Sequence, residues 1–90
     1  GLFEPGLDQS LYLVSAHSGD VEVRLPAPSA PQAVGRTVTV KKADPSSNPV
    51  TVTRADGGGP DNEAIVLDAF GHALTVMSNG AGWHVIGRNP

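Results

Sequence analysis

Glycine and proline punctuate this chain at short intervals, and the residues between them alternate between apolar and polar. The 90 residues include 11 glycines and 8 prolines. Alternation with a period of two is typical of a strand with one buried face, and glycine or proline between such runs marks turns. The sequence therefore predicts an all-β domain with scarcely any helix.

About seven short antiparallel strands in a small β-sandwich fit the spacing of these runs. Residues 36–42 and 49–54 place valines on one face and threonines or cations on the other, and we expect them to pair as a hairpin through the loop 44–48. Asn79-Gly80 predicts a second hairpin. The predicted strands span 10–16, 21–25, 36–42, 49–54, 63–67, 73–77 and 83–86.

Several of these strands carry apolar residues on both faces, for example Tyr12 with Leu13 and Val85 with Ile86. A lone two-layer sandwich needs only one apolar face per strand. A domain of this size buries only about 60–65% of its unfolded surface, and the chain has no cysteine to form a disulfide. The pattern favours self-association through the second apolar face. The alternative is a compact barrel with few solvent-exposed positions.

Trp83 is the only tryptophan in a chain with 4% aromatic residues. It is either a core residue under the closing hairpin or an exposed platform for stacking a sugar. The scarcity of aromatic residues favours the core. The residues expected to carry folding and assembly are Tyr12, Val23, Leu25, Val38, Val40, Val52, Ile65, Leu67, Val76, Trp83, Val85 and Ile86.

Charge argues against a nucleic acid partner, and hydropathy argues against insertion into a membrane. The net charge is -3, and the 6 lysines and arginines are scattered apart from the pair Lys41-Lys42. Such a chain has no basic face for a nucleic acid backbone. No apolar run approaches the roughly 18 residues of a membrane helix, so we expect no membrane insertion.

No metal or cofactor site is expected. His17, His72 and His84 have no ligand spacing relative to one another. The loop 44–48 begins like a calcium loop, but Pro49 stands where that loop needs glycine and Ala55 where it needs glutamate. An ion on a threefold axis is the one alternative left open.

Catalysis is not expected either. The sequence has no nucleophile elbow. Asp56, Asp61 and Glu63 offer paired carboxylates for glycoside cleavage, but they lie in a flexible loop without an apolar cleft around them. If the domain binds a receptor, its irregular polar loops are the place to look. The candidate receptor-binding residues are Asp56, Asp61, Asn62, Glu63 and His72.

Four segments carry a resemblance to a known family: 23–26 (VRLP), 35–44 (GRTVTVKKAD), 48–52 (NPVTV) and 74–87 (LTVMSNGAGWHVIG). Together they resemble the small trimeric β-domains of bacteriophage tail fibres, tailspikes, tail-needle knobs and head fibres. The resemblance covers roughly residues 20–87. One departure is the segment 59–63, a longer and more polar loop than the isoleucine-aspartate-glycine turn common in that family.

The resemblance implies a homotrimer, a location on the virion, and a function as the C-terminal head or tip domain of a phage appendage. Such a domain would trimerise the fibre end and contact a glycan or protein receptor on the host cell surface. Residues 1–9 are then a connector from a longer parent chain, and residues 10–90 are the sandwich domain. The alternatives are a carbohydrate-binding or immunoglobulin-like module of a bacterial surface protein, and a capsid decoration or head-fibre domain.

Overall fold

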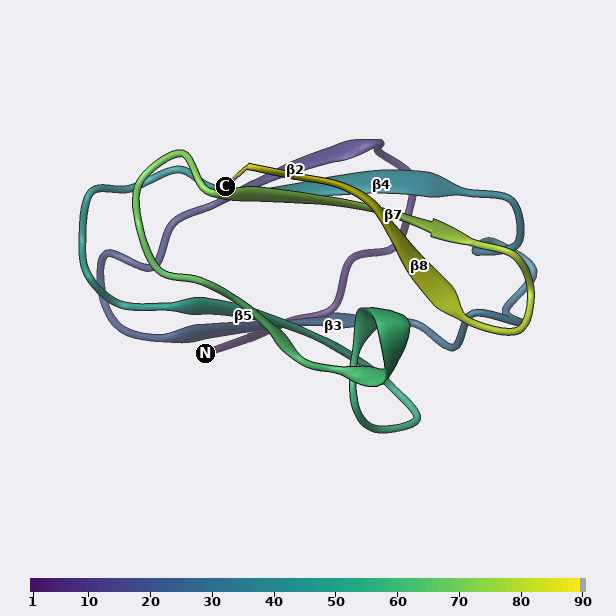
Figure 1. Cartoon of the computed structure of the whole chain (residues 1–90). Coiled ribbons are helices and arrows are strands. Elements are labelled where there is room, and N and C mark those ends of the chain that lie inside the picture. Colours follow the sequence, from purple (N-terminus) through teal and green to yellow (C-terminus); the bar gives the residue numbers. More distant parts are fainter. Residues whose placement is uncertain (90) are drawn as a thin grey trace.

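The alternating runs form two stacked β-sheets in the computed structural model of the chain, which describes residues 1–89, with Asn62 described through its backbone alone. The first sheet has the strand order β1-β3-β5-β6, and the second has the order β2-β4-β7-β8. The elements are β1 (Leu2–Phe3), β2 (Leu11–Val14), β3 (Val21–Leu25), β4 (Thr37–Lys42), β5 (Val50–Arg54), the 3-10 turn η1 (Pro60–Asn62), β6 (Ile65–Leu67), β7 (Ala73–Ser78) and β8 (Trp83–Asn89). Figure 1 shows the two layers, and the prediction of an all-β domain is confirmed.

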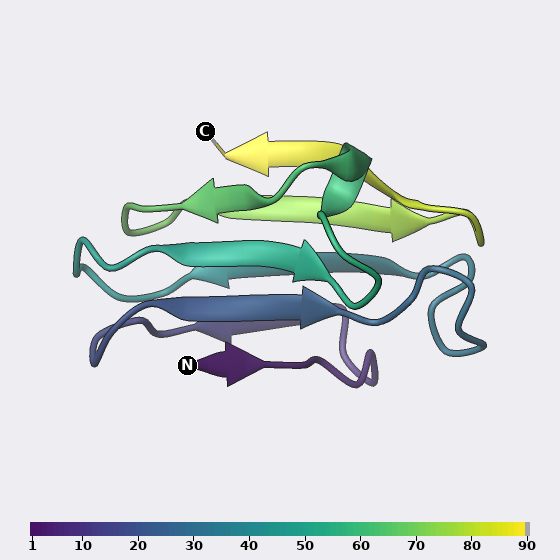
Figure 2. The same ribbon diagram turned by 90° about the horizontal axis from the view of Figure 1, so that it is seen from below.

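Strand direction differs from the prediction, because both sheets are mixed. The pairs β1–β3, β3–β5 and β2–β4 are parallel, whereas β5–β6, β4–β7 and β7–β8 are antiparallel. From β1 to β5 the chain changes sheet at every connection. Strands that follow each other in the sequence therefore lie in different layers and run in opposite directions. Within one layer, neighbouring strands of this part of the chain run parallel, as Figure 2 shows.

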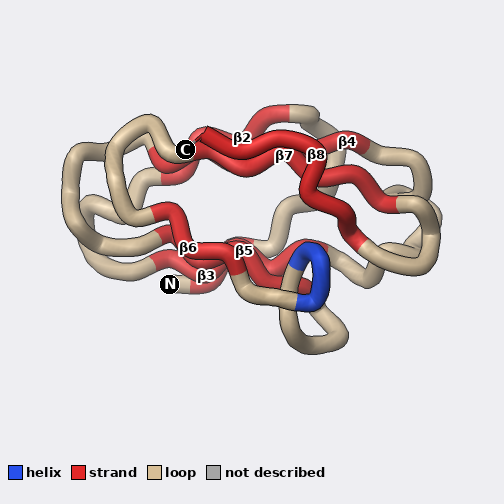
Figure 3. Tube along the Cα trace, in the orientation of Figure 1, coloured by secondary structure: helices blue, strands red, loops and turns tan. Residues whose placement is uncertain are grey.

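The predicted hairpin between 36–42 and 49–54 is wrong for the same reason. β4 belongs to the second sheet and β5 to the first, so the segment 44–48 connects two layers instead of two paired strands. The hairpin predicted from Asn79-Gly80 does form, since β7 and β8 pair antiparallel from Ser78 and Trp83 onward. Figure 3 shows the loops gathered at the two ends of the sandwich.

Residues 1–9, expected to be a connector, contribute to the sandwich. β1 adds a strand to the edge of the first sheet by pairing with β3. Leu7 is buried, and the rings of Phe3 and Tyr12 lie 5.6 Å apart between their centroids. Two apolar residues are too few to show a period, which is why the sequence did not reveal this strand. Pro90, the last residue of the predicted domain 10–90, lies outside the described residues.

Valine and leucine from both sheets fill the space between the layers. Of the residues expected to carry folding and assembly, Tyr12, Ile65 and Val85 are half-buried, and Ile86 is 56% exposed. Ile86 is the extra residue of a β-bulge, because Val85 pairs with Val76 and Gly87 pairs with Thr75. The buried members of that set are Val23, Leu25, Val38, Val40, Val52, Leu67, Val76 and Trp83.

Trp83 closes the core beneath the proline-rich connection between β3 and β4. Its side chain is 1% exposed, and its Nε1 donates a hydrogen bond of 2.9 Å to the carbonyl oxygen of Pro26. Ser78 Oγ donates to the carbonyl of Pro28 at 2.6 Å. The core interpretation of Trp83 is therefore confirmed, and the same contacts hold the proline-rich loop against the sandwich.

Lys42 lies on the valine face of β4, where the sequence predicted no cation. Its side chain is fully buried, and Nζ lies 2.7 Å from Asp44 Oδ1. Asp44 also accepts the backbone N–H of Ala16 at 2.8 Å and that of Ser46 at 3.0 Å. Buried ions need such partners to offset their lost hydration. This network joins the connection between the sheets to the end of β2.

We expect Trp83→Ala to lower the free energy of unfolding by about 3–5 kcal/mol, because it leaves a large cavity in a packed core. Trp83→Phe should lose less, since it removes the hydrogen bond to Pro26 but keeps most of the ring volume. The measurement is urea unfolding followed by far-UV circular dichroism. Phe70→Ala is the matched control, because that ring is 65% exposed. An unfolding midpoint that is equal for Trp83→Ala and Phe70→Ala would contradict the core assignment.

Acid should destabilise the domain through Asp44. The Lys42 ammonium and the Ser46 hydroxyl beside Asp44 hold the pKa of that carboxyl well below its usual range. A lowered folded pKa gives stability that is present above the unfolded value of about 4 and is lost as the pH falls below it. We expect Asp44→Asn to be less stable at pH 7 and to lose less further stability between pH 5 and pH 2.5.

The matched control for acid unfolding is Asp20→Asn, which changes an exposed carboxylate. Some acid sensitivity should remain in Asp44→Asn, because the Thr53 hydroxyl and Arg24 also lower the pKa of Glu22. Denaturant midpoints across this pH range measure the slope. A slope for Asp44→Asn that equals those of the unmodified chain and of Asp20→Asn would refute the contribution of Asp44.

Candidate functional site

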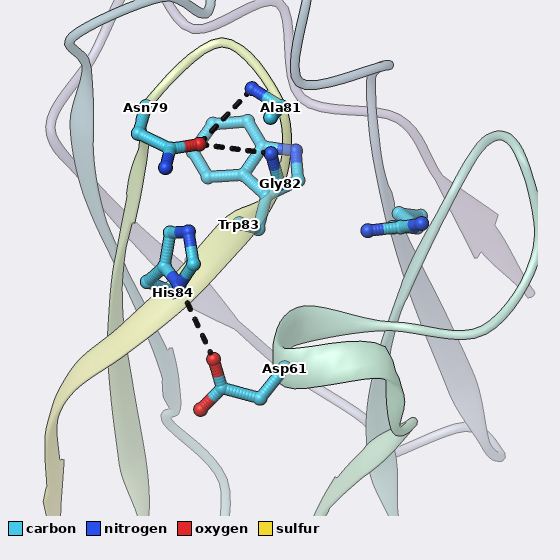
Figure 4. Close-up of a pocket in the computed structure, with 7 residues that line it drawn as sticks. Asp61, Asn79, Ala81, Gly82, Trp83 and His84 are labelled. Atoms are coloured by element: carbon cyan, nitrogen blue, oxygen red, sulfur yellow. Dashed lines mark hydrogen bonds and ion pairs between the residues drawn. The ribbon is translucent and has the colours of Figure 1, made fainter.

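A hollow of about 240 Å³ lies at one end of the sandwich, between η1 and the β7–β8 hairpin. Figure 4 shows the side chains of Asn79, His84 and Asp61 around it. Trp83 contributes to the lining although almost none of its surface is exposed. The residues that line the hollow are Arg54, Asp61, Asn79, Ala81, Gly82, Trp83 and His84.

The hairpin loop that forms one wall is ordered by Asn79. Its Oδ1 accepts hydrogen bonds from the backbone N–H groups of Ala81 and Gly82, both at 3.0 Å. The backbone N–H of Asn79 donates to the Gly82 carbonyl at 3.2 Å. Gly80 has a φ of +91°, a conformation that glycine adopts without strain. The Asn79-Gly80 pair that predicted a turn therefore also orders one wall of the hollow.

The opposite wall is η1, which approaches β8 closely. Asp61 has a φ of +51°, a left-handed conformation that aspartate tolerates better than most residues. Its Oδ1 lies 3.6 Å from His84 Nδ1, and both side chains are about half exposed. An ion pair this exposed contributes at most about 1 kcal/mol when the imidazole is protonated.

Arg54 brings a guanidinium group to the hollow from the end of β5. Its Nε lies 2.7 Å from Asp56 Oδ1 and donates to the carbonyl of Gly57 at 3.2 Å. The Arg54 side chain is 18% exposed and that of Asp56 is 49% exposed. Asp56 therefore holds the guanidinium in place from the solvent side.

The structure brings together some of the predicted receptor-binding residues and separates others. Asp61 lines the hollow, Asp56 orients Arg54, and Glu63 is exposed just beyond η1. The side chain of Asn62 lies outside the described residues. His72 lies in the loop between β6 and β7, and Figure 2 shows this loop at the opposite end of the sandwich from η1. Its Nδ1 lies 3.3 Å from Asp68 Oδ1.

Sequence reasoning missed Arg54, His84 and Asn79 as members of one site. They come from the end of β5, the start of β8 and the hairpin between β7 and β8. Within β8, Trp83 is buried and the next residue, His84, is exposed, as alternation along a strand requires. The meeting of β8 with η1 depends on the packing of the two sheets, and no local pattern reveals it.

The hollow offers hydrogen-bond donors and an acceptor within a small space. The guanidinium of Arg54 donates, the carboxylate of Asp61 accepts, and the imidazole of His84 does either. Such a mixture suits a ligand with hydroxyl or carbonyl groups. The indole ring of Trp83 offers no exposed face for stacking.

A second feature is the position of the exposed apolar side chains. Six of the eight large apolar residues that are exposed among the described residues lie on the four edge strands, and the other two, Val34 and Phe70, lie in loops. The central strands present threonine and charged residues outward instead, such as Thr39, Thr51 and Arg24. The six are Leu2 and Phe3 on β1, Leu11 and Leu13 on β2, Val66 on β6, and Ile86 on β8.

Comparison with models of known protein families, with curated proteins and with solved structures finds no match for this chain. Among the described residues, no three His, Asp or Glu side chains are grouped so that they would hold a metal ion. The same part of the chain contains no helix with the length and apolar character needed to span a membrane. Function is therefore argued from the hollow and the edge strands.

We expect Gly59→Ala to open the hollow. A Cβ at this position would lie 2.7 Å from the carbonyl carbon of Glu63 and 2.8 Å from the Cα of Ala64, so the backbone leading from η1 has to move. The contact between Asp61 and His84 should be lost, and the free energy of unfolding should fall by about 1–3 kcal/mol. Backbone amide and histidine NMR spectra report the displacement.

Gly82→Ala is the matched control for this prediction. Its Cβ would lie 3.8 Å from His84 Nε2 and 3.9 Å from Arg54 Nη1, which is ordinary contact. The control should keep the His84 and Trp83 resonances near their original positions. Unchanged spectra in both variants would show that η1 is not held as described.

Proposed function

We propose that this chain is a head or tip domain of a phage virion appendage, such as a tail fibre, spike or needle, and that it acts without catalysis. It forms a homotrimer at the fibre end and contacts the surface of the host cell. The observation that carries the proposal is the concentration of exposed apolar side chains on the edge strands. The resemblance of the closing hairpin and the threonine-rich strands to phage β-domains supports the same function.

Self-association would bury apolar side chains that a single copy of this domain exposes on its edge strands. Monomeric proteins usually protect edge strands with charges, proline or a covering segment. β2 has no charged residue and no proline, and its Leu11 and Leu13 are instead 48% and 64% exposed. Burial of such side chains against other copies adds roughly 25 cal/mol per Å² of apolar surface removed from water.

Contact with the cell is assigned to the hollow lined by Arg54, Asp61 and His84. A ligand in so small a site makes few contacts and binds weakly. Three copies on one fibre end strengthen such binding by avidity, by about 10²- to 10⁴-fold when all three sites are engaged. A hydroxyl-rich surface glycan or a polar protein loop fits the donors and the acceptor of the hollow.

The alternative of a carbohydrate-binding module in a bacterial surface protein has less support. Such modules stack sugars on exposed aromatic rings in the binding site, and Trp83, the one aromatic residue that lines the hollow, is 1% exposed. A capsid decoration domain shares the need for edge contacts. The two viral functions differ in what the domain binds, intact capsids or cells.

We expect a solution mass of three chains, or three times 9.2 kDa, when the domain is measured by light scattering after size exclusion at several concentrations. The fluorescently labelled trimer should bind cells of at least one strain in a panel of bacteria and should not bind purified phage capsids. A monomer at all concentrations would refute the trimeric part of the proposal. Binding to capsids alone would replace the tip domain with the decoration domain.

Variants locate the contact on the domain. Asp61→Asn should weaken cell binding about 10-fold or more if this carboxylate accepts a hydrogen bond from the ligand. His72→Gln, at the opposite end, is the matched control and should leave binding unchanged. Loss of binding in His72→Gln alone would move the contact to the 68–72 loop.

A further inference from the structure

Gly82 leaves an open place in the wall of the hollow, within reach of two side-chain nitrogens. A Cβ at this position would lie 3.8 Å from His84 Nε2 and 3.9 Å from Arg54 Nη1, which is ordinary contact. All three residues line the hollow, where Figure 4 labels Gly82 and His84. Because hydrogen bonds between nitrogen and oxygen are about 2.9 Å long, both nitrogens can bond to a ligand placed over Gly82.

The carboxylate of Asp61 assigns a role to each nitrogen of the His84 ring. Nδ1 lies 3.6 Å from Asp61 Oδ1, and the negative charge beside it favours the tautomer that carries its proton on Nδ1. In this neutral form Nε2 has a lone pair and accepts a hydrogen bond. Nε2 is also the ring nitrogen within 4 Å of the place over Gly82. His84 therefore presents an acceptor to a ligand there.

Arg54 supplies the complementary donor. Its Nε lies 2.7 Å from Asp56 Oδ1 and donates to the Gly57 carbonyl at 3.2 Å, which fixes the plane of the guanidinium. Nη1 is the atom of this group that lies toward Gly82. A guanidinium nitrogen donates hydrogen bonds and does not accept them. The place over Gly82 is thus flanked by one acceptor and one donor.

An anion does not suit this place, because an anion needs donors alone. The backbone N–H groups of the hairpin loop are taken by Asn79 Oδ1. Asp56 balances the charge of Arg54, and Asp61 adds a second carboxylate to the same end of the sandwich. With a neutral imidazole, the hollow has no excess of positive charge to attract a carboxylate or a phosphate.

We infer that the hollow binds a neutral sugar through two neighbouring hydroxyl groups over Gly82, one donating to His84 Nε2 and the other accepting from Arg54 Nη1. A hydroxyl group both donates and accepts. The single hydroxyl of a serine or threonine side chain would bond both nitrogens only if they were within about 6 Å of each other, whereas hydroxyls on adjacent ring carbons span a longer distance. Because Trp83 is buried, the sugar is held by its edge without stacking.

This inference rests on the proposed function and narrows it, since it names the receptor on the cell as a glycan instead of a protein loop. Two hydrogen bonds and no stacked ring give weak binding at each copy. Such binding needs the avidity of several copies to hold a cell.

The first test treats the cells. Mild periodate cleaves the bond between carbons that carry neighbouring hydroxyls, and a protease removes surface proteins. We expect periodate to weaken binding of the fluorescently labelled domain to a sensitive bacterial strain about 10-fold or more, and the protease to leave it unchanged. Binding is measured at pH 8, above the range in which imidazoles usually titrate.

The second test fills the place over Gly82. Gly82 does not have a left-handed φ, and a Cβ there makes only ordinary contacts, so Gly82→Ala should fold like the unmodified chain, as circular dichroism will check. Its methyl group takes the space of the hydroxyls, and cell binding should fall about 10-fold or more. Gly6→Ala is the matched control, because its Cβ would meet only Asp8 Oδ1, at 3.9 Å, and Gly6 does not line the hollow.

Two variants of His84 test the role of Nε2 as an acceptor. The side chain of His84→Gln keeps an acceptor oxygen and should retain most of the binding, whereas His84→Lys offers donors alone and should lose about 10-fold or more. His84 is exposed, so both variants should fold. A merely structural role of the imidazole would make the two variants equally weak.

Three outcomes overturn the inference and leave the proposed tip domain standing. Equal binding by Gly82→Ala and Gly6→Ala places the ligand elsewhere. Loss of binding after protease but not after periodate makes the receptor a protein. Stronger binding by His84→Lys than by the unmodified chain makes the ligand an anion. If the unmodified chain binds no strain in the panel, the proposed cell contact fails, and the inference fails with it.

Discussion

The architecture depends on a chain that crosses between two layers at each of its first four connections. Each crossing places a loop over one end of the core, where the loop's polar backbone needs partners. The buried Lys42–Asp44 pair supplies them at the connection from β4 to β5, since Asp44 accepts N–H groups from Ala16 and Ser46. Trp83 and Ser78 supply them at the proline-rich connection by donating to Pro26 and Pro28. Strand pairing alone would leave both loops loosely attached.

The sequence predicted the strands better than their pairing. Alternation is a local property, and it located seven of the eight strands to within a few residues, together with the hairpin at Asn79-Gly80. The period is the same whether a loop returns to the same sheet or crosses to the other. The 44–48 segment therefore looked like a hairpin, although it joins β4 to β5 across the core. Lys42 shows the same limit, because a lysine on a valine face is acceptable only when a partner such as Asp44 lies nearby.

The candidate site was predictable in part. Loop composition pointed to Asp56, Asp61 and Glu63, and these do lie at one end of the sandwich with the hollow. Arg54 and His84 complete that hollow from strands that are distant in sequence. His72 shares only its polarity with the others, and the topology places its loop at the opposite end. Composition thus selects polar loops, whereas the order of strands in the sheets decides which loops meet.

The edges and the ends of the sandwich differ in their exposed residues. The ends carry polar loops held by internal hydrogen bonds and ion pairs, which fix groups such as the guanidinium of Arg54. The edges carry leucine, valine and isoleucine, which gain from burial and offer little specificity. The same crossing topology that made the pairing hard to predict therefore places the hollow at one end of the sandwich and most of the exposed large apolar side chains on its edge strands.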